Sequence, residues 1–119
     1  MSNSYQYPQL NYDGIIDNDT NAAIDIFETL GTTQKIYIER GSLSVFKAAV
    51  GGGGHLEIMD TAGEVYFSSD VDEVKNIPIN WGDEGRQIAE GEGVQVVLSG
   101  AATEQASVHV ALTGHYRVR

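Results

Sequence analysis

The stretch Ser107–Arg119, which reads SVHVALTGHYRVR, decides the fold class of this chain. Apolar or small residues occupy alternate positions, namely Val108, Val110, Leu112, Gly114, Tyr116 and Val118. A period of two places successive side chains on opposite faces of a β-strand. The stretch therefore predicts one long strand with an apolar face on a core and a polar face in water.

Shorter segments of the same kind precede it and are separated by glycine-rich or polar turns. The expected strands are Gln34–Arg40, Leu43–Val50, His55–Met59, Glu64–Ser68, Val74–Trp81 and Val94–Ser99. The segment Asn18–Leu30 fits a helix or a strand, because Ile24, Phe27 and Leu30 have helical spacing while β-branched residues favour a strand. Roughly seven or eight strands about ten residues apart predict an all-β fold, an antiparallel β-sandwich of jelly-roll kind.

Two local signals refine this expectation. Thr61-Ala62-Gly63 predicts a tight hairpin turn, because glycine readily adopts the left-handed conformation that such turns need. The turn should bring Glu64–Ser68 back with Val65 and Phe67 facing inward. Pro78 lacks an N–H group for a sheet ladder and favours a strand at a sheet edge.

The amino-acid composition limits which classes of molecule this chain is expected to bind. The 119 residues are enough for one domain, and 17 acidic against 7 basic residues give a net charge of −10. Such a charge disfavours nucleic acid and anionic membranes, and it suits a basic partner surface. There is no cysteine, and the sequence has neither a signal-peptide pattern nor a long apolar run. We therefore expect synthesis in the cytoplasm and no disulfide.

The first residues differ from the rest. Residues 1–14 are polar and rich in tyrosine, which predicts an extended N-terminal arm preceding a sandwich domain at 15–119. A neighbouring subunit would hold such an arm, although it could also pack on its own domain. The candidate interface residues are Tyr5, Tyr7 and Tyr12 in the arm, with Arg117 and Arg119 at the other end of the chain.

A metal site has one weak candidate. Residues 17–28 place oxygen-bearing side chains at calcium-loop positions, namely Asp17, Asp19, Asn21, Asp25 and Glu28. Ala22 stands where that loop requires glycine, and the flanks do not resemble its two helices. An acidic turn leading into a strand is the favoured interpretation. His55, His109 and His115 are expected to be exposed strand residues, and no cofactor is expected.

No pattern for catalysis is found. There is no Gly-x-Ser-x-Gly turn and no cysteine nucleophile, and the paired carboxylates lie in polar loops. The tetraglycine Gly51–Gly54 lacks the lysine of a phosphate-binding loop. Trp81, followed by acidic residues, could stack on a sugar, but a tryptophan ending an alternating strand more often belongs to a core. We therefore expect a binding protein rather than an enzyme.

Four stretches, Thr33–Ile38, Leu56–Ser68, Gly91–Gly100 and Val108–Tyr116, resemble small jelly-roll proteins of tailed bacteriophage particles, in particular head decoration (cement) proteins. The resemblance covers most of residues 15–119 and transfers no functional residue. It implies a homotrimer on the phage head surface, seated on the lattice of the major capsid protein at three-fold or quasi-three-fold axes. It also implies that the protein stabilises the shell against the pressure of packaged DNA.

Two alternatives remain open at this point. A carbohydrate- or receptor-binding β-sandwich would use Trp81 and the loop Gly82–Gly93, with calcium near Asp17–Glu28. A tail or collar adaptor of the same virion would share the fold and composition. The sequence does not separate these from a head decoration protein.

Overall fold

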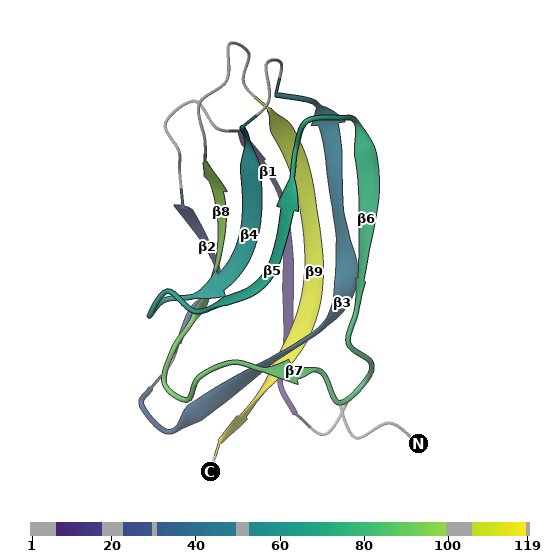
Figure 1. Cartoon of the computed structure of the whole chain (residues 1–119). Helices are drawn as coiled ribbons and strands as arrows, with labels where there is room; N and C mark the ends of the chain where they lie inside the picture. Colours follow the sequence, from purple (N-terminus) through teal and green to yellow (C-terminus); the bar gives the residue numbers. More distant parts are fainter. Residues whose placement is uncertain (1–6, 18–22, 30, 50–52, 100–105, 119) are drawn as a thin grey trace.

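The chain forms two antiparallel β-sheets packed face to face, which confirms the expected β-sandwich (Figure 1). This computed structural model describes residues 7–17, 23–29, 31–49, 53–99 and 106–118. Its strands are β1 (Gln9–Asp17), β2 (Ala23–Phe27), β3 (Gln34–Lys47), β4 (His55–Asp60), β5 (Val65–Asp70), β6 (Lys75–Asn80), β7 (Arg86–Gln87), β8 (Val94–Ser99) and β9 (Ser107–Val118). The described residues contain no helix, so none that could cross a membrane.

The chain crosses repeatedly between the two sheets. Sheet A has the order β1-β9-β3-β6, with the short β7 also paired to β3, and sheet B has the order β2-β8-β4-β5. The long strand read from the C-terminal sequence, β9, pairs with β1 on one side and with β3 on the other. β6 carries Pro78 and ends sheet A, so the edge position predicted from this proline is confirmed.

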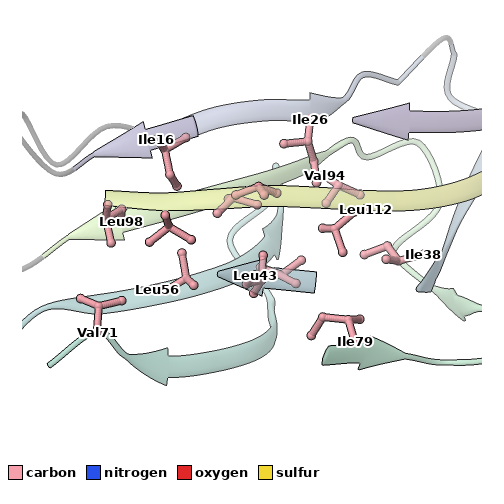
Figure 2. Packing of buried hydrophobic residues seen from close by; sticks show 14 of the residues in the cluster. Ile16, Ile26, Ile38, Leu43, Leu56, Val71, Ile79, Val94, Leu98 and Leu112 are labelled. Carbon is pink, nitrogen blue, oxygen red and sulfur yellow. The ribbon is translucent and has the colours of Figure 1, made fainter. Parts of the chain in front are cut away.

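The core fills the space between the sheets (Figure 2). β9 contributes Val108, Val110 and Leu112, all at most 1% exposed, from the face that the alternation predicted. Sheet B faces them with buried aliphatic residues such as Leu56, Val96 and Leu98. Burying a side chain of this size stabilises a domain by about 1.5–3 kcal/mol. Burial of these alternating aliphatic side chains is therefore the main interaction that holds the two sheets together.

The N-terminal boundary differs from the expectation of an arm over residues 1–14. Residues from Gln9 onward form β1 and pair in register with β9 as far as Asp17 opposite Ser107. Leu10, Tyr12 and Ile16 alternate toward the core. Backbone hydrogen bonds to β9 thus draw this segment into the sandwich, which extends it N-terminally by six residues.

Two further details differ from the sequence reading. Gln34–Arg40 and Leu43–Val50 were expected as separate strands, but one continuous strand, β3, runs from Gln34 to Lys47. Val65 was expected inside and is 42% exposed, because a register irregularity between Ile58 and Met59 shifts the pairing of β4 with β5. Such irregularities change which residues face the core. The segment Asn18–Leu30 contains the strand β2.

The predicted turn at Thr61-Ala62-Gly63 joins β4 to β5, with Gly63 at a φ of 101°. The buried Asp60 holds this turn. Its Oδ1 accepts hydrogen bonds from the N–H groups of Ala62 and Glu64, both at 3.0 Å, and its Oδ2 accepts one from the Tyr66 hydroxyl at 2.8 Å. The Tyr66 oxygen in turn accepts the Ala89 N–H at 3.1 Å, so the turn is tied to the loop after β7.

The same contacts shift two pKa values. Burial by itself would raise the pKa of Asp60, but the hydrogen bonds from Tyr66, Glu64, Ala62 and Gly63 outweigh it and lower the pKa below the ordinary 3.8. Burial, together with the hydrogen bond to the Asp60 carboxylate, raises the pKa of Tyr66 to about 12. Both groups are therefore in their ordinary charge states at neutral pH, with a carboxylate accepting from a phenol.

A prediction follows for Asp60→Asn. Because the folded pKa lies below the unfolded one, the carboxylate stabilises the fold above about pH 4, and this contribution is lost as the pH falls through the folded pKa. We expect Asp60→Asn to lower the free energy of unfolding at pH 7 by about 1–3 kcal/mol. The difference in free energy of unfolding between wild type and Asp60→Asn, measured by urea unfolding, should become smaller as the pH falls toward 2.

The exposed Glu73→Gln serves as the control, because it removes one carboxylate without disturbing a buried hydrogen bond. A deficit of Asp60→Asn that stayed constant from pH 7 to pH 2 would contradict the assigned direction of the pKa shift.

Candidate functional site

Two of the residues expected at an interface, Tyr7 and Arg117, lie together around His115 near the C-terminal end of β9. The His115 ring lies between those of Tyr7 and Tyr37, at centroid separations of 5.3 and 5.0 Å and interplanar angles of 16° and 8°. The Arg117 guanidinium carbon lies 4.6 Å from the Tyr7 centroid and 4.2 Å from that of Tyr37. Two tyrosine rings therefore enclose a histidine and an arginine. We call Tyr7, Tyr37, Glu39, His115 and Arg117 the His115 cluster.

Glu39 enters the cluster through a β-bulge. Ile38 pairs with Gly114 and Arg40 pairs with Thr113, so Glu39 is an extra residue without its own partner on β9. Its carboxylate is buried, and Oε2 lies 2.5 Å from Nδ1 of the fully buried His115. A buried carboxylate is costly unless it is paired and hydrogen-bonded. The bulge thus supplies His115 with an acidic partner that regular pairing would not provide.

The hydrogen bonds fix which nitrogen of His115 carries the proton. The Arg117 Nε–H can only donate, and it lies 3.1 Å from His115 Nε2, so Nε2 accepts. Nδ1 then carries a hydrogen and donates to Glu39. Arg117 also donates to the exposed Glu84 at 3.2 Å, which extends the network to the loop before β7.

This arrangement is suited to holding the chain together rather than to proton transfer. A glutamate that orients a histidine also occurs in catalytic sites, where the second ring nitrogen faces the reacting group. In the His115 cluster that nitrogen is taken by Arg117, and tyrosine rings cover both faces of the imidazole. The cluster therefore anchors the chain at Tyr7, beside the end of β9.

Tyr12, the other candidate tyrosine that the structure describes, lies elsewhere. It packs against the core from the edge strand β1 and borders an open depression of about 540 Å³ on the outer face of sheet A. The depression exists because its floor includes small residues such as Ser42, Ala111 and Thr113, whose short side chains leave this space unfilled. Asn11 and Asp13 stand at its β1 side. The polar outer face of sheet A is thus hollowed at its centre.

The remaining interface candidates, Tyr5 and Arg119, lie outside the described residues. Glu39 and His115 were missed by the sequence analysis, and His115 is buried where an exposed strand residue was expected. The available signal was that Tyr37, Glu39 and His115 all fall on the polar face of their strands. Their proximity depends on the pairing of β3 with β9, which no local pattern encodes.

The calcium candidates do not form a helix-flanked loop. Asp17 ends β1, Asp25 lies within β2, and Asp25 accepts a hydrogen bond from Gln95 at 3.1 Å. Glu28 follows β2, while Asp19 and Asn21 lie outside the described residues. Across 7–17, 23–29, 31–49, 53–99 and 106–118, no group of three or more histidine, aspartate and glutamate side chains has a metal-binding arrangement.

Trp81 lies just beyond β6 and is partly buried against the core. The guanidinium carbon of Arg86 lies 5.8 Å from its ring centroid and 5.2 Å from that of Tyr66. A sugar-stacking tryptophan needs an open ring face. The contacts with Arg86 and the core leave Trp81 less accessible than an exposed platform would be.

Comparison with known proteins assigns no family. No family model matches the chain, and no curated protein is significantly similar to it in sequence.

Proposed function

We propose that this chain is a structural virion protein, a decoration protein that binds the major capsid protein of a tailed bacteriophage and stabilises its head. The observation that carries the proposal is the strand order. Apart from β7, eight strands form sheets of order β1-β9-β3-β6 and β2-β8-β4-β5. Consecutive strands alternate between the sheets except at the hairpin of β4 and β5, which is the order expected of a jelly roll.

Surface chemistry supports the same proposal. A net charge of −10 on 119 residues favours a partner with basic residues. The His115 cluster holds Tyr7, the first described residue, at one end of the sandwich, beside the end of β9. We propose that this N-terminal segment, including Tyr5, contacts a neighbouring copy in a homotrimer or the capsid. The protein would be made in the host cytoplasm and act on the head surface.

The test uses purified protein and shells of the major capsid protein of the same virus that lack this chain. We expect the protein to co-sediment with the shells in a saturable manner and to raise the temperature at which they come apart. The isolated protein is expected to have the mass of three chains in analytical ultracentrifugation. Protein that stays in the supernatant at micromolar concentration would contradict the proposal.

Deletion of residues 2–6 tests the N-terminal segment separately. The first strand begins at Gln9, so the truncated chain keeps every strand of the sandwich and is expected to keep its β-rich far-ultraviolet circular dichroism spectrum. We expect it to lose assembly or shell binding. A truncated protein that still forms trimers and coats shells would show that the segment is not the contact.

A further inference from the structure

Exposed apolar side chains gather at one end of sheet A. In the described part of the chain, the large hydrophobic residues that are exposed are Ile15 at 63%, Phe46 at 52%, Val65 at 42% and Val74 at 67%. Ile15 and Phe46 belong to β1 and β3 of sheet A, and Val74 directly precedes β6 of the same sheet. Only Val65 lies on sheet B.

The strand register brings Ile15, Phe46 and Val74 to the same end of sheet A. Val45 pairs with Lys75, so Phe46 and Val74 are the next residues beyond this pair. Ile15 pairs with His109, which pairs with Ser44, two residues before Phe46. Ile16 and Val45, the neighbours of Ile15 and Phe46, are buried in the core, which puts Ile15 and Phe46 on the outer face, and Val74 is exposed next to Phe46. We call Ile15, Phe46 and Val74 the apolar patch.

Figure 1 shows this end of the sandwich at the top, where β3 ends and β6 and β9 begin. Two residues of β9 lie between β1 and β3 at this level: His109, which pairs with Ile15 and Ser44, and Ser107, which pairs with Asp17 and Lys47. The His109 Nε2 lies 2.7 Å from Asp13 Oδ1, so this polar pair borders Ile15. No strand lies between Phe46 of β3 and Val74, which directly precedes β6. Apolar side chains clustered on one face of a soluble protein are typical of a protein–protein contact.

Charges around the patch are mostly acidic. Asp17 and Asp13 are exposed on β1, where Asp13 contacts His109 at 2.7 Å, and Asp72 and Glu73 are exposed immediately before Val74. On the basic side, Lys47 is exposed, while Lys75 forms an ion pair with Asp70 at 2.9 Å. An apolar centre with an acidic rim complements an apolar projection surrounded by basic residues. A second copy of this acidic chain would meet like charges at the rim.

We infer that the apolar patch docks this protein onto a basic-rimmed apolar projection of a different protein, which under the proposed function is the major capsid protein. The inference rests on that proposed function and adds which face contacts the shell. The patch lies at the opposite end of β9 from the His115 cluster, because β9 begins at Ser107 and the cluster lies at His115 and Arg117. Under this inference the shell binds at the patch end, and the N-terminal segment at the other end contacts a neighbouring copy.

The experiment compares wild-type protein, Phe46→Ser and the matched control Val65→Ser in co-sedimentation with shells. Both substitutions shorten an exposed apolar side chain, so neither is expected to affect folding, which thermal unfolding checks. We expect Phe46→Ser to weaken shell binding at least tenfold and Val65→Ser to leave it within about twofold. Asp17→Lys is expected to weaken binding, and added salt should reduce the wild-type affinity.

The outcomes separate the two proposals. Wild-type binding that Phe46→Ser leaves unchanged would overturn the docking inference while the proposed function stands. Absence of wild-type binding would overturn the proposed function, and the docking inference with it. If ultracentrifugation shows that Phe46→Ser dissociates an oligomer of the isolated protein, a second copy covers the patch and the inference is wrong.

Discussion

Gly41→Ala is expected to prevent stable folding. A Cβ atom at Gly41 would lie 1.9 Å from the carbonyl oxygen of Ala111 and 2.8 Å from the Cα of Leu112. Both are backbone atoms of β9, and Gly41 pairs directly with Leu112 in the centre of sheet A. Neither atom can yield without separating β3 from β9. We expect a loss of more than about 4 kcal/mol, a large part of the 5–15 kcal/mol that a domain typically has.

The measurement is urea unfolding followed by far-ultraviolet circular dichroism. Gly31→Ala is the matched control, since no atom lies within 4 Å of a Cβ placed there and the same methyl group is added. The control should unfold at the wild-type midpoint or slightly above it. A Gly41→Ala protein with a wild-type midpoint would mean that β3 and β9 do not approach as closely as described.

Glu39→Ala is expected to have the second largest effect, about 3–5 kcal/mol of destabilisation. The substitution leaves the fully buried His115 with an Nδ1–H group and no acceptor, while Arg117 still occupies Nε2. An unsatisfied buried polar group loses its hydration without compensation. The enclosing rings of Tyr7 and Tyr37 restrict the access of water to that nitrogen.

Two further variants serve as controls, and the stability of all of them is measured by thermal and urea unfolding. Glu84→Ala removes the exposed acid that also contacts Arg117, and it is expected to cost at most about 1 kcal/mol. Glu39→Gln keeps an oxygen acceptor of similar shape and should be destabilised less than Glu39→Ala. Equal effects of Glu39→Ala and Glu84→Ala would show that the His115–Glu39 contact does not stabilise the fold.

Much of the secondary structure was predictable because strands have a local signal. β8 matches the expected Val94–Ser99, and the turn at Thr61-Ala62-Gly63 joins β4 to β5 as predicted. The inward face of β9 agrees with its alternation. Each of these depends on the period of two or on a glycine conformation, which residues impose within a few positions of themselves.

The missed features involve contacts between distant residues. Residues 9–14 were expected to belong to an arm, although Leu10, Tyr12 and Ile16 alternate as in a strand. These residues form the edge strand β1 because the backbone of β9 pairs with them, and that pairing has no local signal. Val65 is exposed because of the irregular pairing between β4 and β5. The candidate site shows the same limit, since Tyr7 and Arg117 were identified as interface residues without their shared contact, His115.

The sequence by itself determined that this protein is a β-sandwich, since alternating apolar residues must be buried between two sheets. Only the tertiary structure decided the order of the strands, the bulge at Glu39 and the burial of His115. A bulge changes which side chains face each other, and its position depends on the pairing of β3 with β9 across more than 70 residues of chain. Pairing at that distance has no local pattern.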